Sequence, residues 1–117
     1  MVSRGEEPTP ASAASRTHVD SVSWEDDEET GGLVHMLFET DAVQIGLFKP
    51  GTTADRTIEV RLEANETLLV LAGTAQLEVD GGTPIQLRAG DLISLPKGAQ
   101  TIWVVDQAFR ELWIYSS

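Results

Sequence analysis

Residues 57–80, TIEVRLEANETLLVLAGTAQLEVD, are the stretch of this chain that decides its fold. β-Branched and aliphatic residues dominate it, and Gly73 and the segment 63–65 interrupt it, which is typical of short strands joined by tight turns. Gly73 suits a turn that requires a positive φ, because glycine adopts a positive φ without strain. The stretch therefore predicts three strands, over residues 57–62, 67–72 and 74–80.

The rest of the folded part continues in the same way. Runs rich in aliphatic and aromatic residues alternate with Gly, Pro and Asp, and Asp80-Gly81-Gly82 has the composition of a hairpin turn. Further strands are predicted over residues 33–38, 42–48, 84–88, 92–95, 101–105 and 109–115. About nine short strands without a convincing helix predict an all-β barrel or sandwich.

The first part of the chain has a different composition. Residues 1–23 are rich in Pro, Ser, Ala, Thr and Glu, and they hold too little apolar surface to offset the entropy of ordering. We expect residues 1–31 to form a flexible acidic arm and residues 32–117 to form one β-barrel domain. Trp24 either anchors the arm to the barrel exterior or belongs to a lid or docking tail, and its large apolar area favours the anchor.

Charge and composition exclude several classes of function. The 117 residues include 8 Lys and Arg against 19 Asp and Glu, a net charge of −11, which opposes binding to nucleic acid or to an anionic membrane. Cysteine is absent, so no disulfide, thiol nucleophile or cysteine metal cluster is expected. No apolar run of transmembrane length and no signal segment is evident, and a cytoplasmic location is the expectation.

Two spacings resemble the signature motifs of the cupin superfamily. Glu66 is followed by six residues and Gly73, and Gly90 is followed by five residues and Pro96-Lys97-Gly98. The run from Pro96 to Tyr115, with Trp103 and Arg110, is similar to small single-domain cupins of the ethanolamine-utilisation and ureidoglycine-hydrolase-like group. The resemblance covers roughly residues 33–116 and implies a cupin-type antiparallel β-barrel, also called a double-stranded β-helix or jelly roll.

The resemblance also marks three substitutions. Metal-binding cupins have the pattern His-x-His followed by four residues and then the Glu of the first motif, and a further His after the second motif. These positions fall on Glu59, Arg61 and Thr101, and Glu66 alone keeps the family's ligand. Arginine stays charged and is no metal ligand. We therefore expect no metal at the usual site and no other cofactor.

The altered positions still predict a polar site. Side chains two apart on a strand share a face, so Glu59 and Arg61 are expected to enter the barrel together, opposite Glu66 and Thr101. Trp103 would share the inward face of Thr101 and form part of the pocket wall. Buried charges require partners, so these residues form either a structural ion-pair plug or a working site.

The leading hypothesis is a cupin that binds a small anionic or sugar-like molecule as a binding or accessory protein. Its ligand-binding residues would be Glu59, Arg61, Glu66, Thr101 and Trp103. One alternative is a metal-free isomerase, cyclase or lyase, with Glu59 or Glu66 as a catalytic acid or base and Arg61 binding an anionic group. Another is a metal-dependent enzyme with carboxylate ligands.

A homodimer is the expected assembly. Both faces of the strand at residues 67–71 are largely apolar, which implies that its outer face is covered. A symmetric dimer would cover it, and the resembling cupins are commonly dimeric. Trp113 and Tyr115 share one face of the last strand and are expected to pack in the barrel or at a subunit contact.

Overall fold

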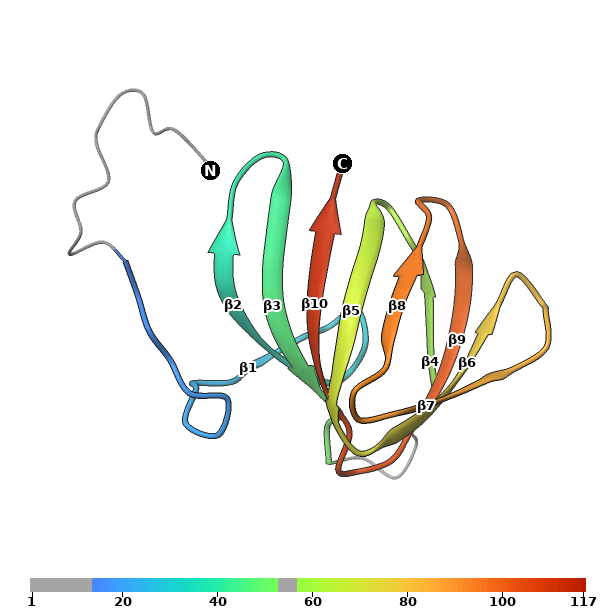
Figure 1. Cartoon of the computed structure of the whole chain (residues 1–117), viewed down its shortest axis with the longest axis horizontal. Coiled ribbons are helices and arrows are strands. Elements are labelled where there is room, and N and C mark those ends of the chain that lie inside the picture. The colour runs from blue at the N-terminus through green and yellow to red at the C-terminus, as the bar shows by residue number, and fades with distance from the viewer. Residues whose placement is uncertain (1–13, 53–56) are drawn as a thin grey trace.

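A computed structural model describes residues 14–52 and 57–117, which form ten strands and no helix. The strands lie in two antiparallel sheets (Figure 1). Their bounds are β1 (Glu25–Asp26), β2 (Leu33–Glu39), β3 (Val43–Lys49), β4 (Thr57–Arg61), β5 (Asn65–Ala72), β6 (Thr74–Val79), β7 (Ile85–Arg88), β8 (Leu92–Leu95), β9 (Gln100–Val105) and β10 (Arg110–Ser116). None of the described residues forms a helix that could cross a membrane.

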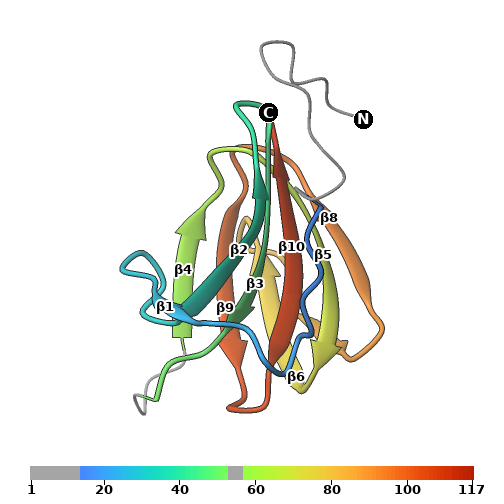
Figure 2. The ribbon, with the colours of Figure 1, turned by 90° about the vertical axis from the view of Figure 1, so that its left-hand side faces the viewer.

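The two sheets face each other. The larger has the order β1-β2-β3-β10-β5-β8 and the smaller has the order β4-β9-β6-β7. Figure 2 shows β4 and β9 on one side of the molecule and β5 and β8 on the other. The expected all-β jelly roll is therefore present, although the ladders do not close the two sheets into a continuous barrel.

All nine strands expected from the sequence are present, with ends that differ by at most two residues. The turns follow the expected chemistry too. Gly73 has a φ of 74°, and a Cβ there would lie 2.5 Å from the backbone nitrogen of Phe109. Asp80 and Gly81 have φ values of 51° and 73°, as the hairpin between β6 and β7 requires.

The segment before β2 contacts the domain. Residues 1–13 of the expected flexible arm lie outside the described residues, as do residues 53–56 of the loop before β4. Glu25 and Asp26 form β1, which pairs with β2 at the edge of the larger sheet. The Lys49 ammonium lies 4.7 Å from the centre of the Trp24 ring, so Trp24 packs against β3.

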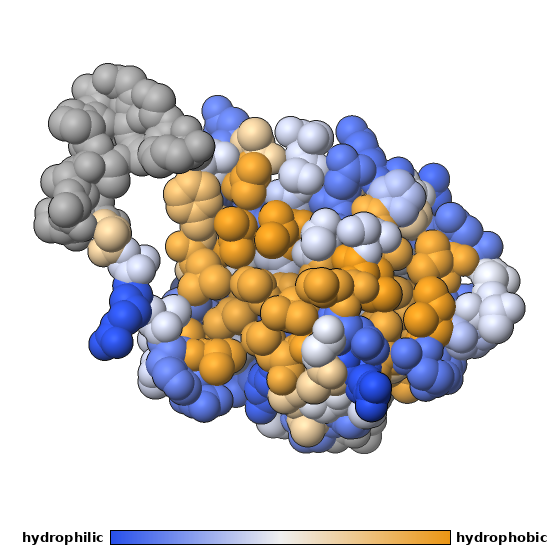
Figure 3. Space-filling view, viewed as in Figure 1, coloured by the Kyte–Doolittle hydropathy of each residue, from blue (hydrophilic) through white to orange (hydrophobic). Residues whose placement is uncertain are grey.

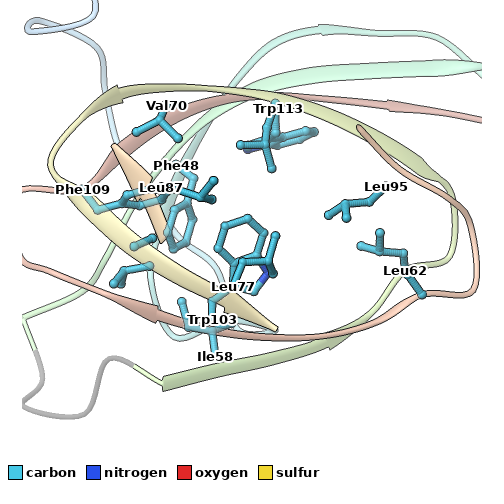
Figure 4. Close-up of a cluster of buried hydrophobic side chains, with 14 residues drawn as sticks. Phe48, Ile58, Leu62, Val70, Leu77, Leu87, Leu95, Trp103, Phe109 and Trp113 are labelled. Carbon is cyan, nitrogen blue, oxygen red and sulfur yellow. The ribbon is translucent and has the colours of Figure 1, made fainter. Parts of the chain in front are cut away.

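The hydrophobic core fills the space between the sheets. Alternate residues of each strand point inward, so that Ala75 and Leu77 of β6 are buried while Gln76 between them is exposed. Leu77 and Phe109 are fully buried. Figure 4 shows side chains from both sheets pointing toward one another in this layer.

The outer face of the larger sheet is also apolar. The register aligns Leu47, Leu112, Leu69 and Leu92 in one row across β3, β10, β5 and β8. Figure 3 shows hydrophobic residues gathered over these strands. Leu92 exposes 70% of its surface. The sequence expectation that both faces of β5 are apolar is therefore confirmed.

Candidate ligand-binding site

A cavity of about 240 Å³ lies between the sheets. This is the volume of roughly eight water molecules at about 30 Å³ each, which suits a small molecule rather than a polymer. Its walls come from both sheets and from the segment after β1, which contributes Asp27, Glu29 and Thr30. The described lining includes aliphatic side chains, aromatic rings and carboxylic acids.

Five aromatic residues line the cavity among the described residues: Phe48, Trp103, Phe109, Trp113 and Tyr115. The rings of Trp113 and Tyr115 are 4.8 Å apart, and Phe109 lies 6.3 Å from both Phe48 and Trp103. These are spacings at which rings attract one another beyond the burial of their area. Figure 4 shows Phe48, Trp103 and Trp113 directed into the space between the sheets. The rings therefore give the cavity a large apolar surface.

Two of the carboxylic acids are almost completely buried. Glu66 exposes 5% of its surface and Glu111 exposes 6%. Within residues 14–52 and 57–117, neither carboxyl has a hydrogen-bond or ion-pair partner. Buried polar groups in folded proteins are normally paired, so two unpaired carboxyls in one cavity call for a functional explanation.

Burial changes the acidity of this group of residues. It raises the pKa of Glu66 to about 7, and the nearby Glu29 carboxylate adds to the effect. Burial also raises the pKa of Glu111 well above its usual range, with a smaller contribution from Glu66. The pKa of Tyr115 is raised by burial and then by Glu66, so Tyr115 is neutral. The pKa of Glu29 is raised by burial and by Asp27.

The orientation expected for Glu59 and Arg61 is wrong. Both side chains are exposed, and the residues of this segment that line the cavity are Ile58, Val60 and Leu62. The physical reason is the alternation of the strand itself, because burying Ile58, Val60 and Leu62 removes apolar surface from water. The same alternation leaves the charged side chains on the solvent face.

Glu66, Thr101 and Trp103 do point inward, with different roles. Glu66 and Trp103 line the cavity, whereas Thr101 lies behind it and is fully buried. The Thr101 hydroxyl donates a hydrogen bond to the Val60 carbonyl at 2.7 Å and accepts one from Trp103 Nε1 at 3.2 Å. Thr101 therefore positions the Trp103 ring and connects β9 to β4.

Arg61 lies beside the cavity rather than in it. It lines a neighbouring hollow of about 370 Å³, together with Glu63 and the chain end at Ser116 and Ser117. Glu29 and Tyr115 line both spaces, so the hollow adjoins the cavity. The structure thus separates Arg61 from Glu66, Thr101 and Trp103, and Glu59 lines neither space.

The family model described as "EutQ-like cupin domain" matches residues 48–112, which is more than half of the chain. The chain belongs to the EutQ-like cupin family. No curated protein matches this EutQ-like cupin.

Solved structures with the same fold cover most of the chain. A protein assigned to ethanolamine utilization (EutQ) from Salmonella typhimurium is 17% identical, with 85% of this chain and 82% of that chain covered and a TM-score of 0.72. The polyketide cyclase RemF from Streptomyces resistomycificus is 21% identical, with 88% and 79% covered and a TM-score of 0.73. The Cnp3 cupin domain from Schizosaccharomyces pombe is 13% identical, with 86% and 72% covered and a TM-score of 0.71. These similarities establish the fold and leave the activity open.

The residues of this EutQ-like cupin do not fit the metal that metal-binding cupins hold. The inward positions of β4 are apolar, and the Thr101 hydroxyl is already hydrogen bonded, which leaves Glu66 as the one expected ligand on the inward face. Among the described residues, no group of three or more His, Asp or Glu side chains is arranged to hold a metal ion.

Sequence reasoning missed Asp27, Glu29 and Glu111. Glu111 had a usable signal, because it lies two residues before Trp113 and four before Tyr115, and side chains at this spacing share a face of a strand. Asp27 and Glu29 had none, since they follow a two-residue strand in a segment assigned to the arm. Trp113 and Tyr115 were expected to pack in the barrel or at a subunit contact, and they line the cavity of this EutQ-like cupin.

Proposed function

We propose that this EutQ-like cupin binds a small organic molecule in the cavity between its sheets. The observation that carries the proposal is the pair of unpaired, buried carboxyls, Glu66 and Glu111, in a cavity walled by aromatic rings. Two buried polar groups without partners destabilise the fold, and a ligand that satisfies them offsets that cost. This arrangement favours the working site over the structural plug, because a plug would supply partners from the protein.

The anionic ligand expected from the sequence depended on Arg61 within the pocket. Arg61 lies outside it, in the neighbouring hollow, and can contact only a part of a ligand that extends into that hollow. The cavity still favours a neutral, ring-shaped or sugar-like ligand, because a ring can stack on the side chains of Trp103 and Trp113.

Intrinsic fluorescence tests the proposal directly. Trp103 and Trp113 line the cavity, whereas Trp24 packs on Lys49 outside it. In a Trp24→Phe variant, the remaining emission reports on the cavity, and a bound ligand should change it saturably. A screen of neutral, cationic and anionic small molecules in which none changes the emission or the melting temperature would reject the proposal.

An enzyme is the second candidate, and the acidity of Glu66 favours it. A pKa of about 7 lets a carboxyl both accept and donate a proton near neutral pH, as a general acid or base must. Glu66 would be the catalytic residue of a metal-free isomerase, cyclase or lyase. The proposal rests on this residue and not on the shared fold of a polyketide cyclase. Glu59 has no support in this role because it is exposed.

Proton abstraction can be tested before the substrate is known. Small ketones and 1,3-dicarbonyl compounds are incubated with the protein in D₂O, and deuterium incorporation beside the carbonyl group is followed by NMR. We expect incorporation faster than in D₂O without protein, and Glu66→Gln should lower it to that background rate while Glu59→Gln leaves it unchanged. Equal incorporation by the wild type and by Glu66→Gln would remove Glu66 as the base.

The assembly and location remain proposals. We propose that two copies pack through the accessible part of the leucine row on the larger sheet, Leu112, Leu69 and Leu92, because it is uncharged on a chain whose net charge of −11 otherwise keeps copies apart. The same charge supports the expectation that neither nucleic acid nor an anionic membrane is a partner. A cytoplasmic location stays a prediction from the sequence.

A further inference from the structure

The charges that surround the cavity have one sign. Asp27, Glu29, Glu66 and Glu111 line it, and no Lys, Arg or His does so among the described residues. The acidic side chains come from three separate parts of the chain: the segment after β1, strand β5 and strand β10. Burial favours the neutral form of Glu111, so the negative charge in the cavity comes chiefly from Asp27, Glu29 and Glu66, and no cation among the described lining residues neutralises it.

The buried position of Glu66 makes this more than a surface cluster of acids. Glu66 exposes 5% of its surface and lines the cavity, and its carboxyl has no hydrogen-bond or ion-pair partner within the described residues. A carboxyl that the protein leaves unpaired and directs into a cavity is available to a donor on the ligand. A cationic donor forms the strongest such hydrogen bond with a carboxylate.

The aromatic walls add a second attraction for the same kind of ligand. Tyr115 is the direct cross-strand neighbour of Glu66, and its ring lies 4.8 Å from that of Trp113. The faces of such rings attract organic cations, and the attraction grows when the site is shielded from water. An aromatic wall beside a buried carboxyl is the combination that an ammonium group on an apolar body would satisfy.

We infer that the cavity selects a small organic cation, with its ammonium group at Glu66 beside the Trp113 and Tyr115 rings and its apolar body between the aromatic walls. The inference rests on the proposed ligand-binding function and specifies its ligand class. A bare metal ion does not suit the site, because the aromatic walls supply no ligand atoms and the described acids are not arranged around one point. An anion would face repulsion from Asp27, Glu29 and Glu66.

Three probes of nearly equal shape test the inference: benzylamine, benzyl alcohol and benzoate, which are cationic, neutral and anionic near pH 7. Binding to the full chain is measured by titration calorimetry and by the rise in melting temperature. We expect benzylamine to bind at least tenfold more tightly than benzyl alcohol, and benzoate not to bind. Cyclohexylmethylamine keeps the ammonium group and replaces the aromatic ring with a saturated one. It therefore tests whether the ammonium group, and not the aromatic ring of the probe, directs binding.

Variants assign the effect to the cavity. Glu66→Gln should reduce benzylamine affinity at least tenfold and leave benzyl alcohol affinity within a factor of two. Glu59→Gln removes an equal charge from the exposed face of β4 and should change neither affinity by more than a factor of two. An equal loss in both variants would mean that benzylamine responds to the overall charge of the protein, which would overturn the inference.

The pH dependence gives an independent measurement. Because the pKa of Glu66 is about 7 in the empty cavity, a ligand that requires the carboxylate should bind roughly tenfold more tightly at pH 8 than at pH 6. Asp27, Glu29, Glu111 and Tyr115 face the same space, and Glu63 lies near Glu29, so the Glu66→Gln variant is titrated in parallel. The dependence should be lost in that variant.

The outcomes separate the inference from the function on which it rests. Tighter binding of benzyl alcohol or benzoate than of benzylamine would overturn the cationic ligand and keep a ligand-binding cavity. If neither amine binds while neutral molecules bind, the cationic ligand is likewise overturned and the ligand-binding cavity is kept. Failure of all cationic, neutral and anionic molecules to bind would overturn both the inference and the proposed function.

Discussion

Tyr115 on β10 and Glu66 on β5 are direct cross-strand partners, and both side chains face the cavity between the sheets. Side chains opposite each other in an antiparallel pair lie about 5 Å apart at Cβ. The ladder therefore places two acidic groups together, and burial raises the pKa of each. The stability of the fold is consequently linked to the protonation of the site.

The first prediction concerns pH and Glu66. Its pKa is about 7 in the folded protein against an ordinary value of 4.5, so the folded state holds this proton more tightly than the unfolded state. The contribution of Glu66 to stability is thus fully present below pH 4.5 and is lost as the pH rises through 7. We expect the free energy of unfolding to fall by ~3 kcal/mol over this range.

Urea denaturation at pH 5 and pH 8 measures this dependence. Glu66→Gln should make it shallower, leaving the part that Glu111 and Glu29 contribute, and should leave the protein more stable than the wild type at pH 8. Glu59→Gln, at an exposed position of β4, is the control and should keep the wild-type dependence. An unchanged slope in Glu66→Gln would show that another group holds the proton.

The second prediction is that Glu111→Leu stabilises the protein. Glu111 is buried without a hydrogen-bond partner among the described residues, and burial raises its pKa well above the usual range. Leucine of similar size removes the cost of burying the carboxyl, so the free energy of unfolding at pH 7 should rise by about 1–3 kcal/mol. Urea denaturation at pH 7 checks it, with the exposed Glu59→Leu as the control.

A gain in stability together with weaker ligand binding would be the signature of a residue kept for function. A loss of stability in Glu111→Leu, in contrast, would mean that the carboxyl is paired in solution and that its role is structural.

The third prediction concerns the support of Trp103. Thr101→Val removes the hydroxyl that donates to the Val60 carbonyl and accepts from Trp103 Nε1, and it leaves both groups buried. We expect a loss of about 2–4 kcal/mol in the free energy of unfolding, measured by urea denaturation. Thr67→Val on the exposed face of β5 should cost less than about 0.5 kcal/mol. Equal effects would show that the buried hydroxyl has no special role.

The fourth prediction compares two glycines of similar backbone conformation. Gly73 and Gly81 have φ values of 74° and 73°, but a Cβ at Gly73 would meet the Phe109 backbone nitrogen at 2.5 Å, and one at Gly81 would meet nothing within 4 Å. Gly81→Ala should cost about 1 kcal/mol, and Gly73→Ala should cost at least twice as much. Thermal unfolding of both variants measures the difference in destabilisation. Equal destabilisation by Gly73→Ala and Gly81→Ala would mean that the positive φ alone, and not the close contact with Phe109, requires glycine at position 73.

The fifth prediction tests the proposed dimer. Leu92 exposes 70% of its surface at the end of the leucine row, so Leu92→Lys should convert a dimer to a monomer in light scattering after size exclusion. Val104→Lys, at an exposed position of β9 in the smaller sheet, should leave the dimer intact. A wild-type chain that is already monomeric at high concentration would refute the assembly.

Local patterns in the sequence determine the strands and turns of this protein. Alternating apolar residues and glycines with positive φ depend on neighbouring residues alone, so all nine expected strands and the Gly73 turn were predictable. The inward face of β4 was equally predictable from Ile58, Val60 and Leu62. The motif spacing predicted instead that Glu59 and Arg61 face inward. Spacing alone does not show which side chains lower the free energy of the protein when they are buried.

Tertiary structure alone decides which acids meet. Glu29, Glu66 and Glu111 are far apart in the chain, and the pairing of β10 with β5, together with the docking of β1 on β2, brings them to one cavity. The acidity of Glu66 then depends on how much water the facing sheets exclude, which no local pattern encodes. The sequence by itself thus determines the scaffold, whereas long-range packing determines the chemistry of its interior.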